Sequence, residues 1–174
     1  NYVSSYGCNL TVVPANTETF EVNFEEFEKL ITPKTRGVLM NTPNNPSGAV
    51  YSEETIKRIS AIMENKQEEF GTDIYLISDE PYRELVYENV EVPYVSKYYK
   101  NTFIAYSFSK SLSLPGERIG YLIANSEMKD FEKMAAMGVP EIDYVLNQKA
   151  VESRDFETIE KEMTTIAEFC RKNK

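Results

Sequence analysis

Short apolar runs of strand length alternate along this chain with longer segments whose apolar residues recur at helical spacing. The run at 74–77 is continuously apolar, which is typical of a strand covered on both faces in a parallel sheet. Strands that alternate with helices predict an α/β fold. We expect strands at the following positions: 8–14, 37–40, 74–77, 102–106 and 119–124.

Helix start and stop signals lie between these runs. Segment 23–31 has apolar residues at helical spacing, and Pro33 stops it. Ser52 suits the N-cap of a second helix that ends near Gly71, because a serine side chain can accept a backbone N–H of the first turn. Two further helices are expected at 126–137 and 154–171.

Composition limits what such a chain can bind. Its 174 residues make one domain's worth of sequence, and a net charge of −9 argues against nucleic acid and anionic membranes, because both need a basic face. No apolar run approaches the ~20 residues of a membrane span. The absence of histidine excludes Ser-His and Cys-His nucleophile pairs, and Cys8 and Cys170 make neither a disulfide framework nor a metal site. We expect no metal, no nucleic-acid or membrane partner, and a reducing cytoplasm as the location.

A carboxylate follows the apolar run at 74–77. The sequence Asp79-Glu-Pro-Tyr82 begins where that strand is expected to end, and open α/β sheets place ligands at this end. Walker B strands also carry Asp-Glu after four apolar residues, but the chain has no Gly-Lys pair and therefore no P-loop to accompany one. The other interpretation left open is that Asp79 only caps a helix or a turn.

A stiff polar loop follows the run at 37–40. Two prolines and three asparagines occur in Asn41-Thr-Pro-Asn-Asn-Pro-Ser-Gly48, so the side chains of this loop are held in place. The Asn45-Pro46 bond is a candidate cis peptide. Taken alone, the loop is equally compatible with a simple turn from a strand to a helix.

One lysine stands among small hydroxyl residues after the run at 102–106. In Tyr106-Ser-Phe-Ser-Lys-Ser-Leu-Ser-Leu-Pro-Gly-Glu-Arg-Ile-Gly120, serines flank Lys110, and Arg118 heads the next expected strand. A lysine amine can form a Schiff base with a carbonyl, while hydroxyls and an arginine fork suit a phosphate dianion. An aldehyde and a phosphate on one small molecule describe pyridoxal 5′-phosphate (PLP), the electron-sink cofactor of amino-acid chemistry.

Together the three motifs resemble the class I/II aminotransferases of PLP fold type I. The shared pattern is Asn-x-Pro-x-Asn-Pro-x-Gly, then Asp-Glu-x-Tyr, then Ser-x-Ser-Lys-x4-Pro-Gly-x-Arg-x-Gly. The resemblance covers residues 1–134 and implies the central part of a PLP-binding large domain. That domain is an α/β three-layer sandwich with a mostly parallel sheet flanked by helices. The resemblance further implies amino-group transfer from an amino acid to a 2-oxo acid, PLP as cofactor, and a homodimer for the full-length protein.

The resemblance also implies roles for the matching residues around the cofactor ring. Lys110 would form the internal aldimine and then move the proton between Cα and C4′. Asp79 would pair with the pyridinium nitrogen and keep it protonated, because an opposite charge favours the charged form. Tyr82 and Asn45 would hydrogen-bond the phenolic oxygen.

For the cofactor phosphate, the resemblance implies Ser107 and Arg118 as ligands, with Ser109 as a further contributor. The family keeps a small-residue loop that also binds the phosphate, and this sequence shows no such loop before Asn1. We therefore expect the chain to be a segment of a longer protein. Residues 135–174 are expected to form a helical C-terminal segment in which the resemblance is weak.

Two other functions share the same cofactor residues. The chain could belong to another fold type I PLP enzyme, such as a carbon–sulfur lyase, because the residues that choose which bond at Cα breaks contact the substrate. It could also be a non-catalytic domain that binds PLP or forms a dimer. We expect the isolated chain to be inactive, since separating part of a cooperative α/β core leaves apolar faces uncovered.

Overall fold

The computed structural model describes residues 2–5 and 7–132 of the chain. The chain divides into two compact units, one of residues 1–129 and one of residues 130–174. The predicted helix at 154–171 and the end of the one at 126–137 lie outside the described residues. Residues 126–130 form turns and a bend, so the helix predicted at 126–137 does not begin at residue 126.

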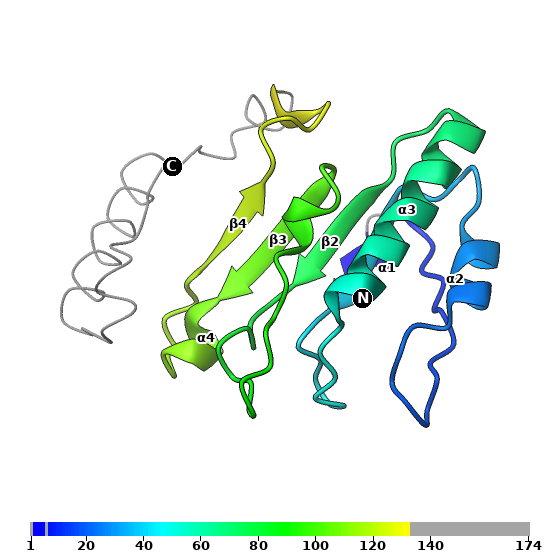
Figure 1. Ribbon diagram of the computed structural model, residues 1–174. Helices are drawn as coiled ribbons and strands as arrows, with labels where there is room; N and C mark the ends of the chain where they lie inside the picture. The colour runs from blue at the N-terminus through cyan, green and yellow to red at the C-terminus, as the bar shows by residue number, and fades with distance from the viewer. Residues whose placement is uncertain (1, 6, 133–174) are drawn as a thin grey trace. The chain divides into compact units, whose positions relative to one another are not determined.

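Four strands form one mixed sheet in the order β1-β2-β3-β4. They are β1 (Gly37–Asn41), β2 (Tyr75–Asp79), β3 (Thr102–Ser107) and β4 (Gly120–Ala124). Figure 1 shows β2, β3 and β4 side by side in that order. The β1–β2 and β2–β3 pairs are parallel, and β3–β4 is antiparallel. An α/β fold with a mostly parallel sheet and flanking helices is thus confirmed, and each of these four strands lies within two residues of its expected position.

The strand predicted at 8–14 was wrong. These residues belong to no helix or strand, and Leu10 and Val12 are 62% and 74% exposed. A strand is stable only where a neighbouring strand satisfies its backbone N–H and C=O groups. Among the described residues, segment 8–14 has no such neighbour.

The two main helices begin and end as their capping residues predict. In α2 (Phe24–Leu30), the Asn23 side chain accepts the Glu26 N–H, and in α3 (Glu53–Phe70), the Ser52 side chain accepts the Thr55 N–H. Gly71 ends α3 in the left-handed region, with φ 61°, which glycine adopts without strain. Three short helices complete the described elements: α1 (Tyr2–Ser5), the 3₁₀ helix η1 (Val95–Lys97) and α4 (Phe108–Ser111).

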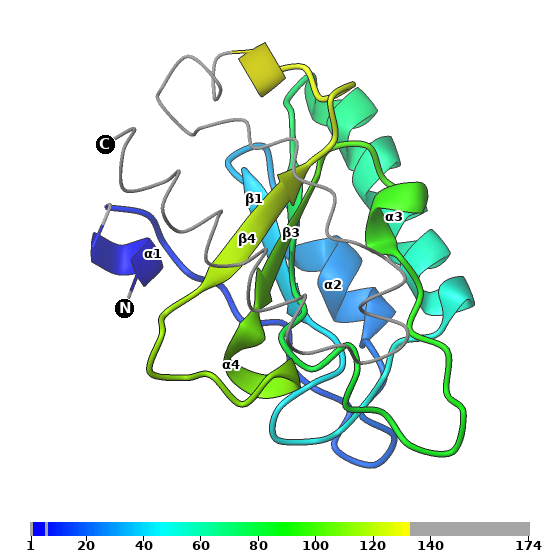
Figure 2. The ribbon, with the colours of Figure 1, turned by 90° about the vertical axis from the view of Figure 1, so that its left-hand side faces the viewer.

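The hydrophobic core lies between one face of the sheet and helices α2 and α3, which lie on the same side of β1 and β3 in Figure 2. Its buried members are Phe27, Ile31, Met40, Ile56, Ile59, Met63, Ile74, Leu76, Val95 and Tyr99. Every second residue of β3 is buried, as the period of two of a strand requires. On the opposite face, Leu39 and Leu122 remain exposed.

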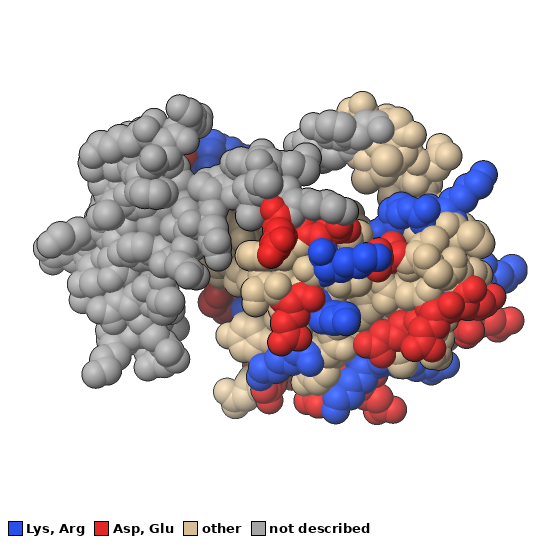
Figure 3. Space-filling view, turned by 90° about the horizontal axis from the view of Figure 1, so that it is seen from above, with Lys and Arg blue, Asp and Glu red and all other residues tan. Residues whose placement is uncertain are grey.

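The carboxyl ends of the three parallel strands meet at one edge of the sheet. Asn41 and Asp79 are register partners there, and β3 ends beside them at Ser107. In Figure 2, β3 runs into α4 at the lower end of the sheet, and β4 returns upward beside it. The view from above in Figure 3 shows acidic and basic side chains intermixed on the described surface.

Candidate functional site

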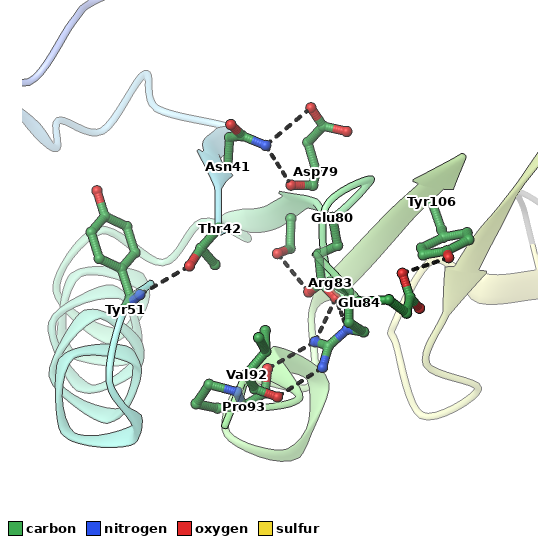
Figure 4. Close-up of polar contacts among 11 residues, drawn as sticks. Asn41, Thr42, Tyr51, Asp79, Glu80, Arg83, Glu84, Val92, Pro93 and Tyr106 are labelled. Carbon is green, nitrogen blue, oxygen red and sulfur yellow. Dashed lines mark hydrogen bonds and ion pairs between the residues drawn. The ribbon is translucent and has the colours of Figure 1, made fainter. Parts of the chain in front are cut away.

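The first part of the site is the end of strands β1 and β2. The Asn41 side-chain amide donates to the backbone oxygen of Asp79 at 2.8 Å, and its nitrogen lies 3.5 Å from Asp79 Oδ2 (Figure 4). Partial desolvation raises the pKa of the Asp79 carboxyl. A cationic group bound beside Asp79 would oppose that effect and favour the carboxylate.

The loop after β1 is held by its own asparagine side chains. Asn41 Oδ1 accepts the Asn45 backbone N–H at 2.9 Å, and Asn44 Oδ1 accepts the Ser47 hydroxyl at 2.7 Å. The Thr42 hydroxyl accepts the Tyr51 N–H at 3.0 Å (Figure 4). The Asn45-Pro46 bond is cis, as the sequence predicted, and the Thr42-Pro43 bond, which was not predicted, is also cis.

This loop meets the turn after β2 at Asn45 and Tyr82. Asn45 Nδ2 donates to the Tyr82 hydroxyl oxygen at 3.1 Å. Because the tyrosine oxygen accepts this bond, its own proton is left to donate to a further acceptor. Lys110 Nζ lies 5.7 Å from the centroid of the Tyr82 ring. Residues from three distant parts of the sequence thus converge around Tyr82.

The serines predicted to bind phosphate lie together at the start of α4. Ser107 caps this helix, because its Oγ accepts the Ser109 N–H at 3.2 Å, and the two hydroxyl oxygens are 2.8 Å apart. Lys110 follows within the same short helix. The structure therefore places two hydroxyls and the lysine on one turn.

Arg118 comes just before β4, close to the start of the expected strand. It lies in a turn with φ 56°, which the sequence did not predict. Its Nη1 donates to the Pro115 backbone oxygen at 3.1 Å. The backbone still brings this segment to the site, since the Phe108 N–H donates to the Ile119 oxygen and Ser107 pairs with Gly120.

Sequence reasoning missed two groups of supporting residues. The buried Glu80 of the Asp79–Tyr82 motif forms an ion pair with the partly buried Arg83, which directly follows the motif. Beyond it, the Tyr106 hydroxyl donates to Glu84 Oε2 at 2.8 Å and lies 2.7 Å from the Ser111 hydroxyl oxygen. Tyr106 has a single proton, so Ser111 is the donor in the second bond.

A signal for Asn41 was present in the sequence. It ends a strand next to the strand that ends at Asp79, and in a parallel pair both residues must lie at one edge. For Glu80 and Arg83 the only signal was two opposite charges three residues apart, which is common on solvated surfaces.

Comparisons with known proteins decide the family. The family model "Aminotransferase class I and II" matches residues 1–172. The chain belongs to the class I and II aminotransferase family. The chain is 36% identical over 113 residues to an aspartate aminotransferase of Pyrococcus horikoshii, a match that covers 64% of this chain and 27% of the relative. It is 38% identical over 120 residues to a probable aspartate/prephenate aminotransferase of Aquifex aeolicus, covering 66% of this chain and 29% of the relative.

Solved structures of aminotransferases also share the fold. An amino transferase from Eubacterium rectale is 53% identical with a TM-score of 0.76, over 78% of this chain and 34% of that protein. A PLP-dependent aminotransferase from Streptococcus suis is 30% identical with a TM-score of 0.62, over 77% of this chain and 34% of that protein. The chain therefore spans about a third or less of the length of these aminotransferases.

Two features of the described residues concern membranes and metal ions. Within residues 2–5 and 7–132, no helix combines the length and the apolar character that a membrane span requires. The same part of the chain holds no group of three or more His, Cys, Asp and Glu side chains that could bind a metal ion.

The residues at the sheet edge fit PLP in their chemistry. Asp79 offers a carboxylate for a ring nitrogen, and the Asn45–Tyr82 pair offers a hydroxyl proton for an oxygen on the ring. Lys110 offers an amine on the turn that carries the Ser107 and Ser109 hydroxyls. A carbonyl, a pyridine nitrogen and a phosphate each find a matching group.

Proposed function

We propose that this chain contributes the cofactor-binding centre of a PLP-dependent aminotransferase, which transfers the amino group of an amino acid to a 2-oxo acid. The observation that carries the proposal is the Asn45–Tyr82 hydrogen bond with Lys110 beside the Tyr82 ring. Three segments far apart in sequence supply these groups, and a merely structural turn would not need an amine among them.

The side chains divide the work around the cofactor ring. PLP supplies an electron sink for the bonds at the amino-acid α-carbon. Asp79 would keep the pyridine nitrogen protonated, and Asn41 orients Asp79 through its backbone oxygen. Tyr82, which accepts a hydrogen bond from Asn45, would donate its own hydroxyl hydrogen to the phenolic oxygen.

The turn after β3 supplies the covalent and phosphate-binding groups. The Lys110 amine would hold the cofactor at its aldehyde and would carry a proton to and from the substrate α-carbon. Ser107 and Ser109 would hold the phosphate through their hydroxyls. Arg118 would join them if its guanidinium left the Pro115 oxygen, which is an exposed contact.

We further propose that the chain works within a longer, dimeric and cytoplasmic enzyme. The support for the greater length is that the chain spans about a third or less of the length of its relatives. We expect no turnover from the 174 residues alone. Aspartate is the first amino donor to test, because several relatives carry the name aspartate aminotransferase.

Absorbance of the full-length gene product with added PLP tests the proposal. A cofactor bound through Lys110 should give a band at about 420 nm, and Lys110→Ala should abolish it. Lys100→Ala is the matched control, because Lys100 is an exposed lysine just before β3, at the end of the strand opposite Lys110, and its loss should keep the band. A band that survives in Lys110→Ala would refute the assigned role.

A further inference from the structure

A buried carboxylate lies inside the motif that carries Asp79 and Tyr82. The Glu80 side chain is only 1% exposed, although its neighbour Asp79 reaches solvent. Its Oε1 accepts the Ser78 hydroxyl at 2.8 Å, and its Oε2 accepts Arg83 Nε at 2.7 Å (Figure 4). Burying a charge is costly unless it is paired and hydrogen-bonded, and Glu80 has both forms of compensation.

The partner of Glu80 reaches across to a second segment. Arg83 Nη1 donates to the Val92 oxygen at 2.8 Å and Nη2 to the Pro93 oxygen at 2.9 Å (Figure 4). The guanidinium carbon also lies 4.2 Å from the centroid of the Tyr94 ring. One arginine fork thus joins the turn after β2 to residues 92–94.

Stability alone explains this arrangement poorly. Replacing a buried ion pair by apolar residues is often neutral or stabilising, so such a pair is weak evidence for a stabilising role. Its position is more informative, because Glu80 directly follows Asp79 and Arg83 directly follows Tyr82. The ion pair closes the turn between these two residues, and the Glu80 N–H donates to the Ala105 oxygen of β3.

We propose that Glu80 and Arg83 are positioning residues that set the Tyr82 hydroxyl relative to Asp79 and tie this geometry to segment 92–94. The inference rests on the proposed function, since it assigns the pair a role toward the cofactor. Neither side chain is predicted to contact the cofactor. They act through the backbone of the turn.

Arg83→Lys is the informative variant, because lysine keeps the positive charge beside Glu80 but cannot reach Glu80, Val92 and Pro93 at once. In the full-length gene product we expect the PLP dissociation constant to rise about tenfold, because losing the net free energy of about one hydrogen bond weakens binding by that factor. Hydrogen–deuterium exchange of the cofactor-free protein should rise in peptides covering 80–94. Exchange in α3 should not change.

Lys29→Met is the matched control, since it removes an exposed ion pair with Glu26 at the same spacing of three residues. It should change neither cofactor binding nor exchange at 80–94. Arg83→Met should exceed Arg83→Lys in both effects, and if it does not fold, Arg83→Lys still decides. If Arg83→Lys bound PLP as tightly as wild type, or if its peptides covering 80–94 exchanged at the wild-type rate, the inference would be overturned. The proposed function would still stand as long as the wild-type protein showed the 420 nm band. Absence of the band in the wild-type protein would overturn both.

Discussion

Among the described glycines, Gly120 is the position where a single methyl group should do most harm. It pairs with Ser107 across β3 and β4, and Ser107 lies three residues before Lys110. A Cβ built on Gly120 would overlap the Tyr106 backbone oxygen and would lie 3.4 Å from the Ser107 Cα. Gly120→Ala therefore forces the two strands apart at the end that carries the proposed phosphate-binding serines.

The cost follows from the nature of the obstacle. Inserting a methyl group into packed structure costs about 1–3 kcal/mol, and the upper end applies because a backbone carbonyl cannot rotate away as a side chain can. A loss of about 3 kcal/mol in a chain of this size lowers the melting temperature by about 6–12 °C. Displacement of Ser107 should weaken PLP binding as well.

Thermal unfolding followed by circular dichroism measures the effect, with Gly116→Ala as the control. Gly116 lies in the turn before the same strand, and a Cβ there would meet nothing within 4 Å. Gly116→Ala should leave the melting temperature unchanged or raise it slightly, because it restricts only the unfolded chain. If the two variants melted at the same temperature, the close contact between β3 and β4 would not be present in solution.

Two further predictions concern Tyr99 and Asp79. The buried Tyr99 hydroxyl donates to the Ile74 backbone oxygen at 2.6 Å. Tyr99→Phe leaves that oxygen without this donor, so the free energy of unfolding measured in urea should fall by about 1–3 kcal/mol. Tyr87→Phe, at an exposed site, should leave it unchanged. Desolvation raises the folded-state pKa of Asp79, so the folded protein binds more protons than the unfolded one between the two pKa values and loses stability as pH rises through that window. Cofactor-free Asp79→Asn should therefore be more stable than wild type at pH 7, by less than about 1 kcal/mol because the carboxyl reaches solvent, and the gap should close by about pH 3. A less stable Asp79→Asn at pH 7 would contradict this sign, and PLP titration should show weaker binding in the same variant.

The elements that sequence reasoning predicted well are those with strong local signals. Helix α3 was found because Ser52 and Gly71 satisfy its ends whatever surrounds them. The run at 74–77 was found because a short, continuously apolar run is typical of a buried strand. Segment 8–14 has the composition of a strand, but pairing depends on a neighbour that local sequence does not specify.

The candidate site divides along the same line. Lys110, Asp79 and Asn45 were assigned to the site because each lies in a motif with a chemical reason of its own, and these assignments stay predictions. The turn at Arg118 was not predicted, because nothing in the sequence demanded its positive φ. The role of Asn41 likewise appears only when β1 and β2 are aligned in register.

The supporting residues explain why a rigid sheet edge suits this chemistry. Asn41 holds Asp79 from β1, while Glu80 and Arg83 hold the turn that carries Tyr82. Strands and the Glu80–Arg83 ion pair therefore hold the groups proposed to contact the ring before any ligand binds. Binding then loses little conformational entropy in ordering them. Arg118 is the exception, because its only described side-chain hydrogen bond is an exposed contact to its own turn. Ordering on cofactor binding should therefore be largest at residues 115–119 and smallest at Asp79 and Tyr82, which comparison of exchange with and without PLP can measure.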